Sequence, residues 1–559
     1  MLKKIAFCIL ILLVFIGGCT TNLYENNGTV QVTSAPSGAE VHLDNENHGT
    51  TLNTMVVPTQ LPPPTPTNKT TSANVRVISL DVIPIVAEPG QAVTVNVKVT
   101  NAGETIGTNK VALTINGAEE EARDVTVAPG ATQTVNFTLT RDISGVFDIK
   151  VAGLNETLRV KQAGTYPRLG NFYIAWHDKG PSLNYLWHPQ PEPTPQLKSL
   201  ARWDIIVVPY SLSRSAPESL RQLRKLNPKI KILAFIQVGE SDVADLIPVQ
   251  SSNESWYLHF GNIPGSFQPP EQRRVGFMPD IKQGFWFMNP ASGWSTYSPN
   301  YIHDDIMSTG LFDGVFLDNL FENVKFKNID INNDGVAENP DVVNREYNNG
   351  MTRILKQTRE LLGPEAIILG NAGSEWSANS PYFLYANGHL QENALGTLTW
   401  SNHDFSKVWE IYQRNMQEPT PPMRIHWISA DSKRFPDNFP SNDTNPSLLP
   451  SELQKMRYGL AITLLEDGYF SFDNGIPWHI QLWWFPEYDA NLGSAKGDAN
   501  KRNDGTWMRE FQNGMVIVNP TGSTSTIDFM STYQDVTTGT MGSRFVVSPE
   551  DGRIFVAAH

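Results

Sequence analysis

The feature that most constrains the fold is an alternation of strand-like and helix-like segments between residues 163 and 500. Eight short apolar segments have the length and composition of buried strands, and segments with helical periodicity lie between them. The strand-like segments are 170–176, 203–210, 230–240, 313–319, 366–373, 388–394, 424–430 and 468–475. Eight strands that alternate with helices are typical of a (β/α)8 TIM barrel, so an α/β fold of this kind is predicted.

An open, doubly wound sheet is the alternative arrangement of the same segments. Such a sheet commonly carries a glycine-rich phosphate-binding loop after its first strand. This chain has no glycine pattern of that kind after its first predicted strand. The barrel is therefore the favoured arrangement.

The segments on either side of the predicted barrel have a different periodicity. In the run AVTVNVKVTN, four valines (Val93, Val95, Val97 and Val99) fall on one face of a strand. Residues 74–162 are therefore predicted to form a β-sandwich, which resembles the CARDB-type modules of surface proteins and has few aromatic residues, as expected of a spacer. Short strands with turns predict a small C-terminal β-domain over residues 501–559.

The first residues resemble an export signal. Two lysines precede the apolar run IAFCILILLVFI, and the sequence IGGC ends at Cys19. This order is similar to a lipoprotein signal over residues 1–19, in which the lipobox cysteine becomes the lipidated N-terminus. A short uncleaved membrane anchor is the alternative. In both cases the rest of the chain is expected at the extracellular face of the membrane.

Two further segments separate this signal from the predicted sandwich. Residues 27–57 contain two short alternating runs around a Pro-Ser-Gly turn and resemble a shortened PEGA β module. Residues 58–73 are rich in Pro and Thr, which predicts an extended linker.

Composition excludes several classes of function. A formal net charge of −14 argues against a nucleic-acid partner. Both cysteines, Cys8 and Cys19, belong to the predicted signal, so the mature chain has no disulfide, cysteine nucleophile or cysteine metal ligand. The sequence has no H-E-x-x-H motif for zinc and no G-x-S-x-G motif, which disfavours an esterase or deacetylase acting on polysaccharide. A monomer is expected.

Polar residues gather where the predicted barrel strands end. In a (β/α)8 barrel the loops that carry chemistry converge at the C-terminal ends of the strands. Carboxylates, amides and indoles at such a mouth suit a carbohydrate, whose hydroxyls bind Asp and Asn and whose C–H faces stack on aromatic rings. The candidate substrate-binding residues are Trp176, Asp178, Glu240, Asn319, Asn371, Trp427 and Asp473.

Two of the acids at this mouth are candidates for catalysis. Asp318 ends the fourth strand-like segment and Glu392 the sixth. Glycoside hydrolysis requires two carboxylates that flank the scissile bond. Each acid has an alternative interpretation: Asp318 as a cap of the following loop, and Glu392 as the partner of an arginine. For Asp473, a substrate contact and a structural hydrogen bond are both open.

Several of these segments together resemble a known family. FDGVFLDN, HLQEN, GYFSFDNG, WWFPEYDANLG and NGMVIVNP occur in the order seen in the hypothetical family fifteen of glycoside hydrolases, which is unrelated to the glucoamylases. The resemblance covers roughly residues 165–559 and implies a TIM-barrel catalytic domain with sugar-hydrolase activity.

The strand-four aspartate and strand-six glutamate are also similar to those of the endo-polygalactosaminidase group. By that likeness Asp318 is the nucleophile and Glu392 the general acid/base, and retention of configuration is expected. Carboxyl groups about 5–5.5 Å apart would support retention, and roughly 6.5–9.5 Å would indicate inversion.

The segment DINNDGVAENPD, residues 330–341, has the spacing of an EF-hand-type loop. The predicted Ca²⁺ ligands are Asp330, Asn332, Asp334, the carbonyl of Val336, and Asp341. The closing residue is Asp instead of the usual Glu, as in dockerin-type loops, and Pro340 before it departs from a standard exit helix. A structural calcium ion is therefore predicted at the rim of the active site, with a solvated acidic turn as the alternative.

These features favour a lipid-anchored, cell-surface glycoside hydrolase that acts on a polysaccharide by a two-carboxylate mechanism. A non-catalytic carbohydrate-binding or adhesion protein on an inactive barrel is the alternative, since both would have an aromatic mouth. The position of Asp318 relative to Glu392 distinguishes the two.

Overall fold

The computed structural model describes most of the chain as two compact units, residues 1–71 and 72–559. The described residues are 22–26, 29–33, 40–43, 46–50, 72–161, 164–174, 193–241, 253–276, 286–373, 375–395, 404–421, 423–432, 448–474, 479 and 481–558. Cys19 with the predicted signal, most of the predicted linker, and the predicted site residues Trp176 and Asp178 lie outside them.

The first unit contains two antiparallel strand pairs within its described residues. Strand β1 (Asn22–Asn26) pairs with β2 (Thr29–Thr33), and β3 (Glu40–Leu43) pairs with β4 (Glu46–Thr50). Strands thus occur where short alternating runs were expected. The likeness to a PEGA module stays a prediction.

The second unit begins with a β-sandwich over the valine-rich segment. One sheet has the order β10-β7-β5 and the other β6-β12-β11-β8-β9. The valines predicted to share a face on β7 are all buried. The strands are β5 (Val75–Ile83), β6 (Val86–Ala87), β7 (Val93–Asn101), β8 (Gly107–Ile115), β9 (Ala118–Val127), β10 (Thr132–Leu139), β11 (Gly145–Val151) and β12 (Leu154–Val160).

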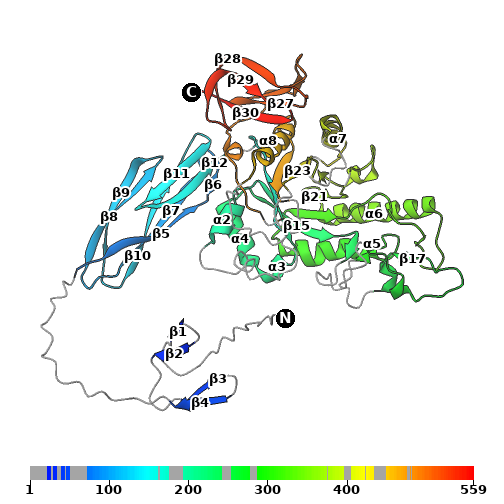
Figure 1. Ribbon diagram of the computed structural model, residues 1–559, viewed down its shortest axis with the longest axis horizontal. Helices are drawn as coiled ribbons and strands as arrows, with labels where there is room; N and C mark the ends of the chain where they lie inside the picture. The colour runs from blue at the N-terminus through cyan, green and yellow to red at the C-terminus, as the bar shows by residue number, and fades with distance from the viewer. Residues whose placement is uncertain are drawn as a thin grey trace, which may run out of the picture. The chain divides into compact units, whose positions relative to one another are not determined.

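An eight-stranded parallel sheet follows, and it is nearly closed into a barrel (Figure 1). Its order is β13-β14-β15-β19-β21-β22-β23-β24, and a parallel bridge between Leu169 and Phe470 joins the two edges. The strands are β13 (Gly170–Phe172), β14 (Ile205–Pro209), β15 (Lys231–Gln237), β19 (Gly314–Asp318), β21 (Ile367–Gly370), β22 (Gly388–Gln391), β23 (Trp427–Asp431) and β24 (Tyr469–Asp473). Each lies within or beside one of the eight segments predicted from the sequence.

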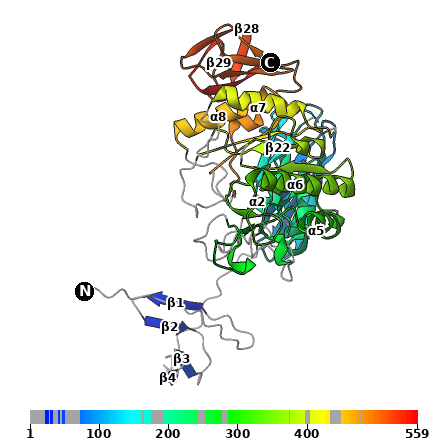
Figure 2. The ribbon, with the colours of Figure 1, turned by 90° about the vertical axis from the view of Figure 1, so that its right-hand side faces the viewer.

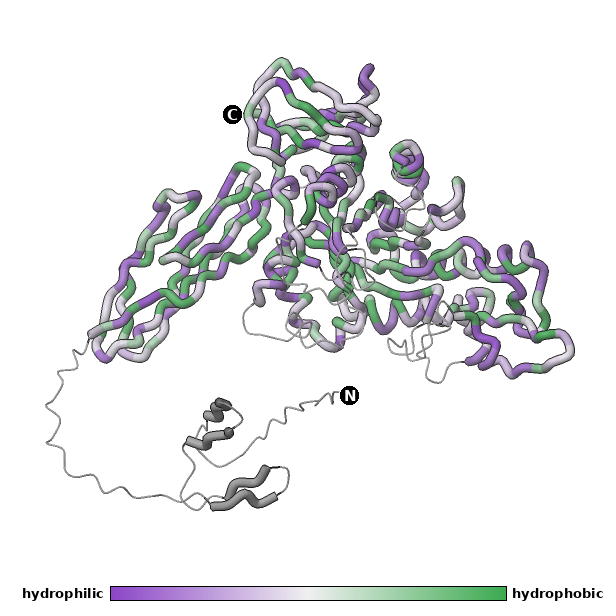
Figure 3. The backbone as a smooth tube through the Cα atoms, viewed as in Figure 1, coloured by the Kyte–Doolittle hydropathy of each residue, from purple (hydrophilic) through white to green (hydrophobic). Residues whose placement is uncertain are grey.

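Alternate residues of these strands fill the interior of the sheet, as the period of two requires. The interior cluster includes Phe172, Phe235, Phe316 and Trp427, with Phe172 and Phe316 rings in edge contact at 5.1 Å. The intervening residues face the helices and form part of the main core. Figure 3 shows hydrophobic segments along these central strands.

Helices lie between most consecutive strands of this sheet, and between β21 and β22 the described connection has only a 3-10 turn (Pro381–Leu384). The longest helix, α6, starts after Asn339, whose side chain accepts a hydrogen bond from the amide of Asp341. The α-helices are α2 (Pro195–Leu200), α3 (Leu212–Ser215), α4 (Pro217–Leu226), α5 (Trp294–Tyr301), α6 (Pro340–Leu362), α7 (Phe405–Gln417) and α8 (Pro450–Leu464).

A six-stranded antiparallel sheet ends the chain and packs on α8 (Figure 2). Arg457 of α8 forms an ion pair of 3.0 Å with Asp551, and Gly552 lies so close to Ala461 that a Cβ atom would approach it to 2.3 Å. The strands are β25 (Asn500–Lys501), β26 (Trp507–Phe511), β27 (Gly514–Asn519), β28 (Ser525–Asp535), β29 (Met541–Val547) and β30 (Asp551–Ala557). Because α8 also contacts β23 and β24, it joins this sheet to the barrel-like one.

No helix among the described residues has both the length and the apolar character needed to cross a membrane.

Candidate active site

Three polar side chains meet at the C-terminal edge of the barrel-like sheet. Asp318 is the last residue of β19, Asn371 directly follows β21, and Glu392 directly follows β22. Asp318 is two residues after Phe316, which faces the interior, so both share the inward side of the strand. In the same way, Asn371 and Glu392 each come two residues after a leucine that faces the interior, Leu369 and Leu390 respectively, so they lie on the inward side as well.

One amide nitrogen connects the two acids. Asn371 Nδ2 donates to Asp318 Oδ1 at 2.9 Å and to Glu392 Oε2 at 3.1 Å. The orientation of this amide is fixed, because its Oδ1 accepts a hydrogen bond from the backbone N–H of Gly373 at 2.9 Å. Asn371 therefore holds both carboxyl groups at one point of the sheet edge.

The shared nitrogen also limits the separation of the acids. Two hydrogen bonds of these lengths to one atom keep the two accepting oxygens no more than about 6 Å apart. The sequence placed Asp318 and Glu392 on the same edge, and the structure brings them together in one site.

Burial and the neighbouring acid perturb the ionisation of Asp318. Desolvation, followed by the negative charge of Glu392, raises the pKa of Asp318 to about 7. Near neutral pH a proton therefore binds readily to Asp318. Perturbed carboxyl groups of this kind are common where general acid/base chemistry takes place.

Glu240 and Asn319 support the site from one side. Asn319 Nδ2 donates to Glu240 Oε2 at 3.0 Å, and Asn319 has a left-handed backbone, with φ of +56°. A Cβ atom on Gly239 would approach the Asn319 carbonyl oxygen to 2.0 Å, so only glycine fits at position 239 beside Asn319. The two predicted substrate contacts thus contact each other, and only 6% of Glu240 is exposed.

Asp473 ends β24 and is buried, and it forms an ion pair with a histidine not predicted for the site. The distance from His479 Nδ1 to Asp473 Oδ2 is 2.7 Å. Interactions with Asp473, Glu392 and Asp318 raise the pKa of His479, although burial is the largest influence and lowers it. His479 lies outside any strand and has no sequence motif, so the sequence offered no signal for it.

A second residue missed from the sequence is Asp431. It is the last residue of β23, is buried, and pairs in register with Asp473. The predicted strand, 424–430, stops one residue before it. Extending that strand by one position would have placed an acid at the sheet edge.

Trp427 was predicted to contact substrate, and this prediction is wrong. The residue begins β23 instead of ending it, and its side chain is 0% exposed. Its ring packs against Phe172 at 4.3 Å, and its Nε1 donates to Ser471 Oγ at 2.9 Å. A Cβ atom on Gly170 would approach the indole to 2.2 Å, so Trp427 fills the interior of the sheet.

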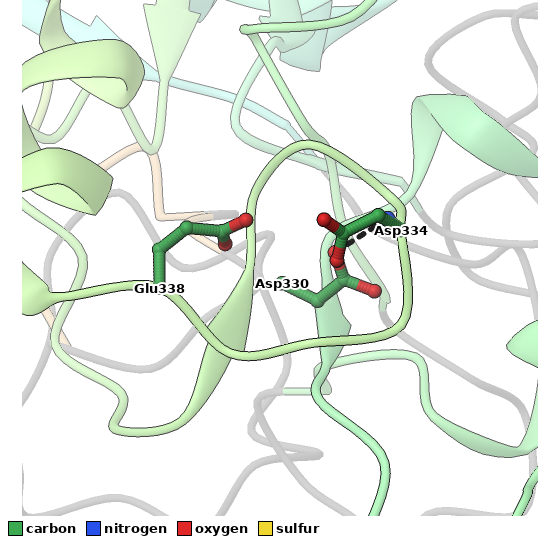
Figure 4. A group of neighbouring side chains, drawn as sticks. All are labelled: Asp330, Asp334 and Glu338. Carbon is green, nitrogen blue, oxygen red and sulfur yellow. Dashed lines mark hydrogen bonds between the residues drawn. The ribbon is translucent and has the colours of Figure 1, made fainter.

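The predicted calcium loop gathers acidic side chains, but in a different combination. Asp330, Asp334 and Glu338 each offer an oxygen within 4.8 Å of the others (Figure 4). Asp330 accepts backbone N–H groups from Asp334 and Gly335 at 3.0 and 2.8 Å, which closes the tight turn.

The other predicted ligands differ in their roles. Asp341 lies in the first turn of α6, outside the acidic cluster, and Glu338 is the third acid instead. Asn332 Nδ2 donates to Asp334 Oδ2 at 3.1 Å, and the Val336 amide donates to Asp334 Oδ1 at 2.8 Å.

Arg273 supplies a positive charge to this loop from within the protein. Its guanidinium lies 2.9 Å from Asp330 Oδ2, and both side chains are buried. Arg273 therefore already compensates part of the negative charge of Asp330 that a calcium ion was expected to compensate.

Comparison with known families identifies the class of protein. The family described as hypothetical glycosyl hydrolase family 15 matches residues 224–515, more than half of the 559 residues. The chain belongs to this family. The matched part of this family 15 protein begins in α4, ends in β27, and contains Asp318, Asn371 and Glu392. A glycoside hydrolase-like protein is thus confirmed. The chain matches none of the curated proteins.

Some solved structures are similar to the family 15 chain at low identity. A cycloisomaltooligosaccharide glucanotransferase from Paenibacillus sp., in complex with cycloisomaltoheptaose, has 12% identity and a TM-score of 0.37, over 87% of this chain and 70% of that one. β-Glucosidases from Erythrobacter marinus and Listeria innocua have 16% and 14% identity and TM-scores of 0.15. Each match covers 16% of this chain and 16% of the β-glucosidase.

Proposed function

We propose that this family 15 protein is a retaining glycoside hydrolase in which Asp318 and Glu392 cleave the O-glycosidic bonds of a polysaccharide. The observation that carries the proposal is the single Asn371 amide nitrogen that hydrogen-bonds both carboxyl groups. The two bridged oxygens lie no more than about 6 Å apart, which agrees better with the carboxyl spacing of about 5–5.5 Å in retaining enzymes than with the roughly 6.5–9.5 Å of inverting ones. The barrel-like sheet is, in this proposal, a (β/α)8 barrel.

The proposed reaction has two displacements. In the first, an ionised Asp318 oxygen attacks the anomeric carbon, the bond to the leaving sugar oxygen breaks, and Glu392 gives its proton to that oxygen. In the second, Glu392 takes a proton from water, whose oxygen attacks the anomeric carbon and releases Asp318. The first step requires the proton on Glu392, so Asp318, whose pKa is raised to about 7, must be ionised before it attacks.

A panel of polysaccharides, including amino-sugar polymers, tests this proposal through the release of new reducing ends. Asp318→Asn and Glu392→Gln should each lower turnover of a responsive glycan by at least about 10³-fold with unchanged folding. Asp341→Asn, on the exposed first turn of α6, is the matched control. Turnover by either site variant close to that of wild type would remove that residue from the mechanism.

The remaining expectations are part of the same proposal. A lipid on Cys19 would hold the protein at the extracellular face of the membrane, where it would meet polysaccharide as a monomer. A structural Ca²⁺ would bind Asp330, Asp334 and Glu338, because oxygen atoms within 4.8 Å of one another suit ligand distances of about 2.3–2.6 Å.

A further inference from the structure

His479 is a titratable group at the site that the proposed double displacement does not use. Its side chain is 14% exposed, and its Nδ1 lies 2.7 Å from Asp473 Oδ2. Its backbone has φ of +37°, a conformation that residues other than glycine rarely adopt. Such a conformation persists where surrounding contacts fix the residue, and it is concentrated at functional sites.

Acidic groups from three strands act on this imidazole. Asp473 belongs to β24, Asp318 to β19, and Glu392 follows β22. All three interact with His479 in the direction that favours its protonated form. The Phe172 ring, with its centroid 5.6 Å from that of the imidazole, provides an apolar contact.

The contact with Asp473 fixes the role of each ring nitrogen. A carboxylate accepts a hydrogen bond, so Nδ1 is a donor and carries a proton. Protonation of Nε2 then gives an imidazolium, whose charge Asp473 stabilises at short range. Asp473 thus acts on the site through His479, and its predicted role as a substrate contact is not needed to explain its position.

The charge of His479 affects the acid pair in return. Asp318 and Glu392 repel each other when both are ionised, and that repulsion raises the pKa of Asp318. The positive charge of His479 acts in the opposite direction on Asp318. A carboxylate that must attack as an anion gains from such a neighbour.

We propose that His479, held by Asp473, is a positioning residue whose positive charge favours the ionised form of the Asp318 carboxylate for attack. This inference rests on the proposed function, because it assigns His479 to the nucleophilic step. It predicts that the titration of His479 depends on Asp473, Asp318 and Glu392.

Titration of the imidazole by NMR tests this coupling without a substrate. The full-length protein is labelled with ¹⁵N-histidine, and the signal of His479 is assigned by its loss in His479→Gln. We expect its midpoint above that of an ordinary histidine. Asp473→Asn, Asp318→Asn and Glu392→Gln should each lower the midpoint, the first by about one pH unit.

His303 provides the matched control, because it is exposed and forms an ion pair of 2.6 Å with Asp304. Its signal should stay unchanged in the three site variants. A His479 midpoint that does not respond to Asp318→Asn and Glu392→Gln, in variants whose backbone spectra match wild type, would overturn the inference.

Activity on a responsive glycan gives the second readout. In His479→Gln the acidic limb of the kcat/KM profile should move to higher pH, because Asp318 loses the charge that favours its ionisation; an unmoved limb would count against the inference. Coupled titration together with full turnover by Asp318→Asn would instead refute the proposed function and leave the coupling intact.

Discussion

At the scale of single residues, the proposed chemistry depends on one asparagine and the two acids that it bridges. Asn371 donates to both carboxyl groups, and its own carbonyl is held by the Gly373 amide. Two acids held this closely repel each other when both are ionised, so the fold is destabilised where the site is charged. Functional sites commonly carry such a cost in stability.

Replacing Asp318 should therefore stabilise the fold in a pH-dependent way. The pKa of Asp318 is about 7 in the folded state, above its ordinary value of about 4. The wild-type protein therefore loses stability as pH rises from about 4 to about 7, because Asp318 ionises more readily in the unfolded state. Asp318→Asn should be more stable than wild type by about 1–3 kcal/mol at pH 8, since one pKa unit corresponds to about 1.4 kcal/mol and Asp318 keeps partial contact with solvent.

Chemical denaturation at pH 4 and pH 8 measures this difference. At pH 4 the two proteins should be nearly equal, and Asp304→Asn, at an exposed position, should match wild type at both pH values. An Asp318→Asn protein that is equally or less stable at pH 8 would show that the carboxylate is not strained.

The sequence predicted residues at this scale only where a strand end was read correctly. Asp318, Asn371 and Glu392 follow runs of apolar residues, which mark strand ends by their period of two. Trp427 was misplaced, and Asp431 missed, because that strand begins and ends later than its apolar pattern indicates. His479 comes from a connection, where no periodicity relates sequence to position.

At the scale of elements, the loop from Asp330 to α6 is the clearest case of a motif that the structure alters. The spacing indicated ligands at positions one, three, five, seven and twelve of an EF-hand-type loop. The fold places Asp341 in the first turn of α6 and brings Glu338 to the other acids. The sequence could not show this, because the capping of α6 by Asn339 decides where the loop ends.

Calcium should raise the melting temperature of the protein through this loop. A ligand that binds only the folded state stabilises it by mass action. Glu338→Gln should remove most of the Ca²⁺-dependent increase, and Asp341→Asn should preserve it. Differential scanning fluorimetry with and without saturating Ca²⁺ measures both. The same increase in Glu338→Gln as in wild type would contradict this ligand set.

At the scale of the whole molecule, the β-sandwich packs on the barrel-like part. Lys198 of α2 forms ion pairs with Asp81, at 2.9 Å, and with Glu156 of the sandwich. The Ile85 amide donates to the Leu226 carbonyl at 2.8 Å, and the Arg159 guanidinium lies 4.6 Å from the centroid of the Trp484 ring. The sequence predicted both parts but could not show this contact, because it joins residues far apart in the chain.

Loss of the charge on Lys198 should weaken the whole unit. Lys198→Met keeps the length of the side chain and leaves two mostly buried carboxylates without their cation, so we expect a loss of about 1–3 kcal/mol. Lys110→Met is the control, since its pair with Glu119 is exposed and should contribute less than about 1 kcal/mol. Calorimetric unfolding compares them, and equal effects would mean that the ion pairs of Lys198 do not couple the sandwich to the rest.

The stereochemistry of the first product tests the central claim most directly. Proton NMR of the anomeric signals, recorded early in the hydrolysis of a responsive glycan, shows the configuration before mutarotation. Two carboxyl oxygens held by one Asn371 nitrogen within about 6 Å of each other predict a product that retains the configuration of the substrate. A first product of inverted configuration would contradict the account.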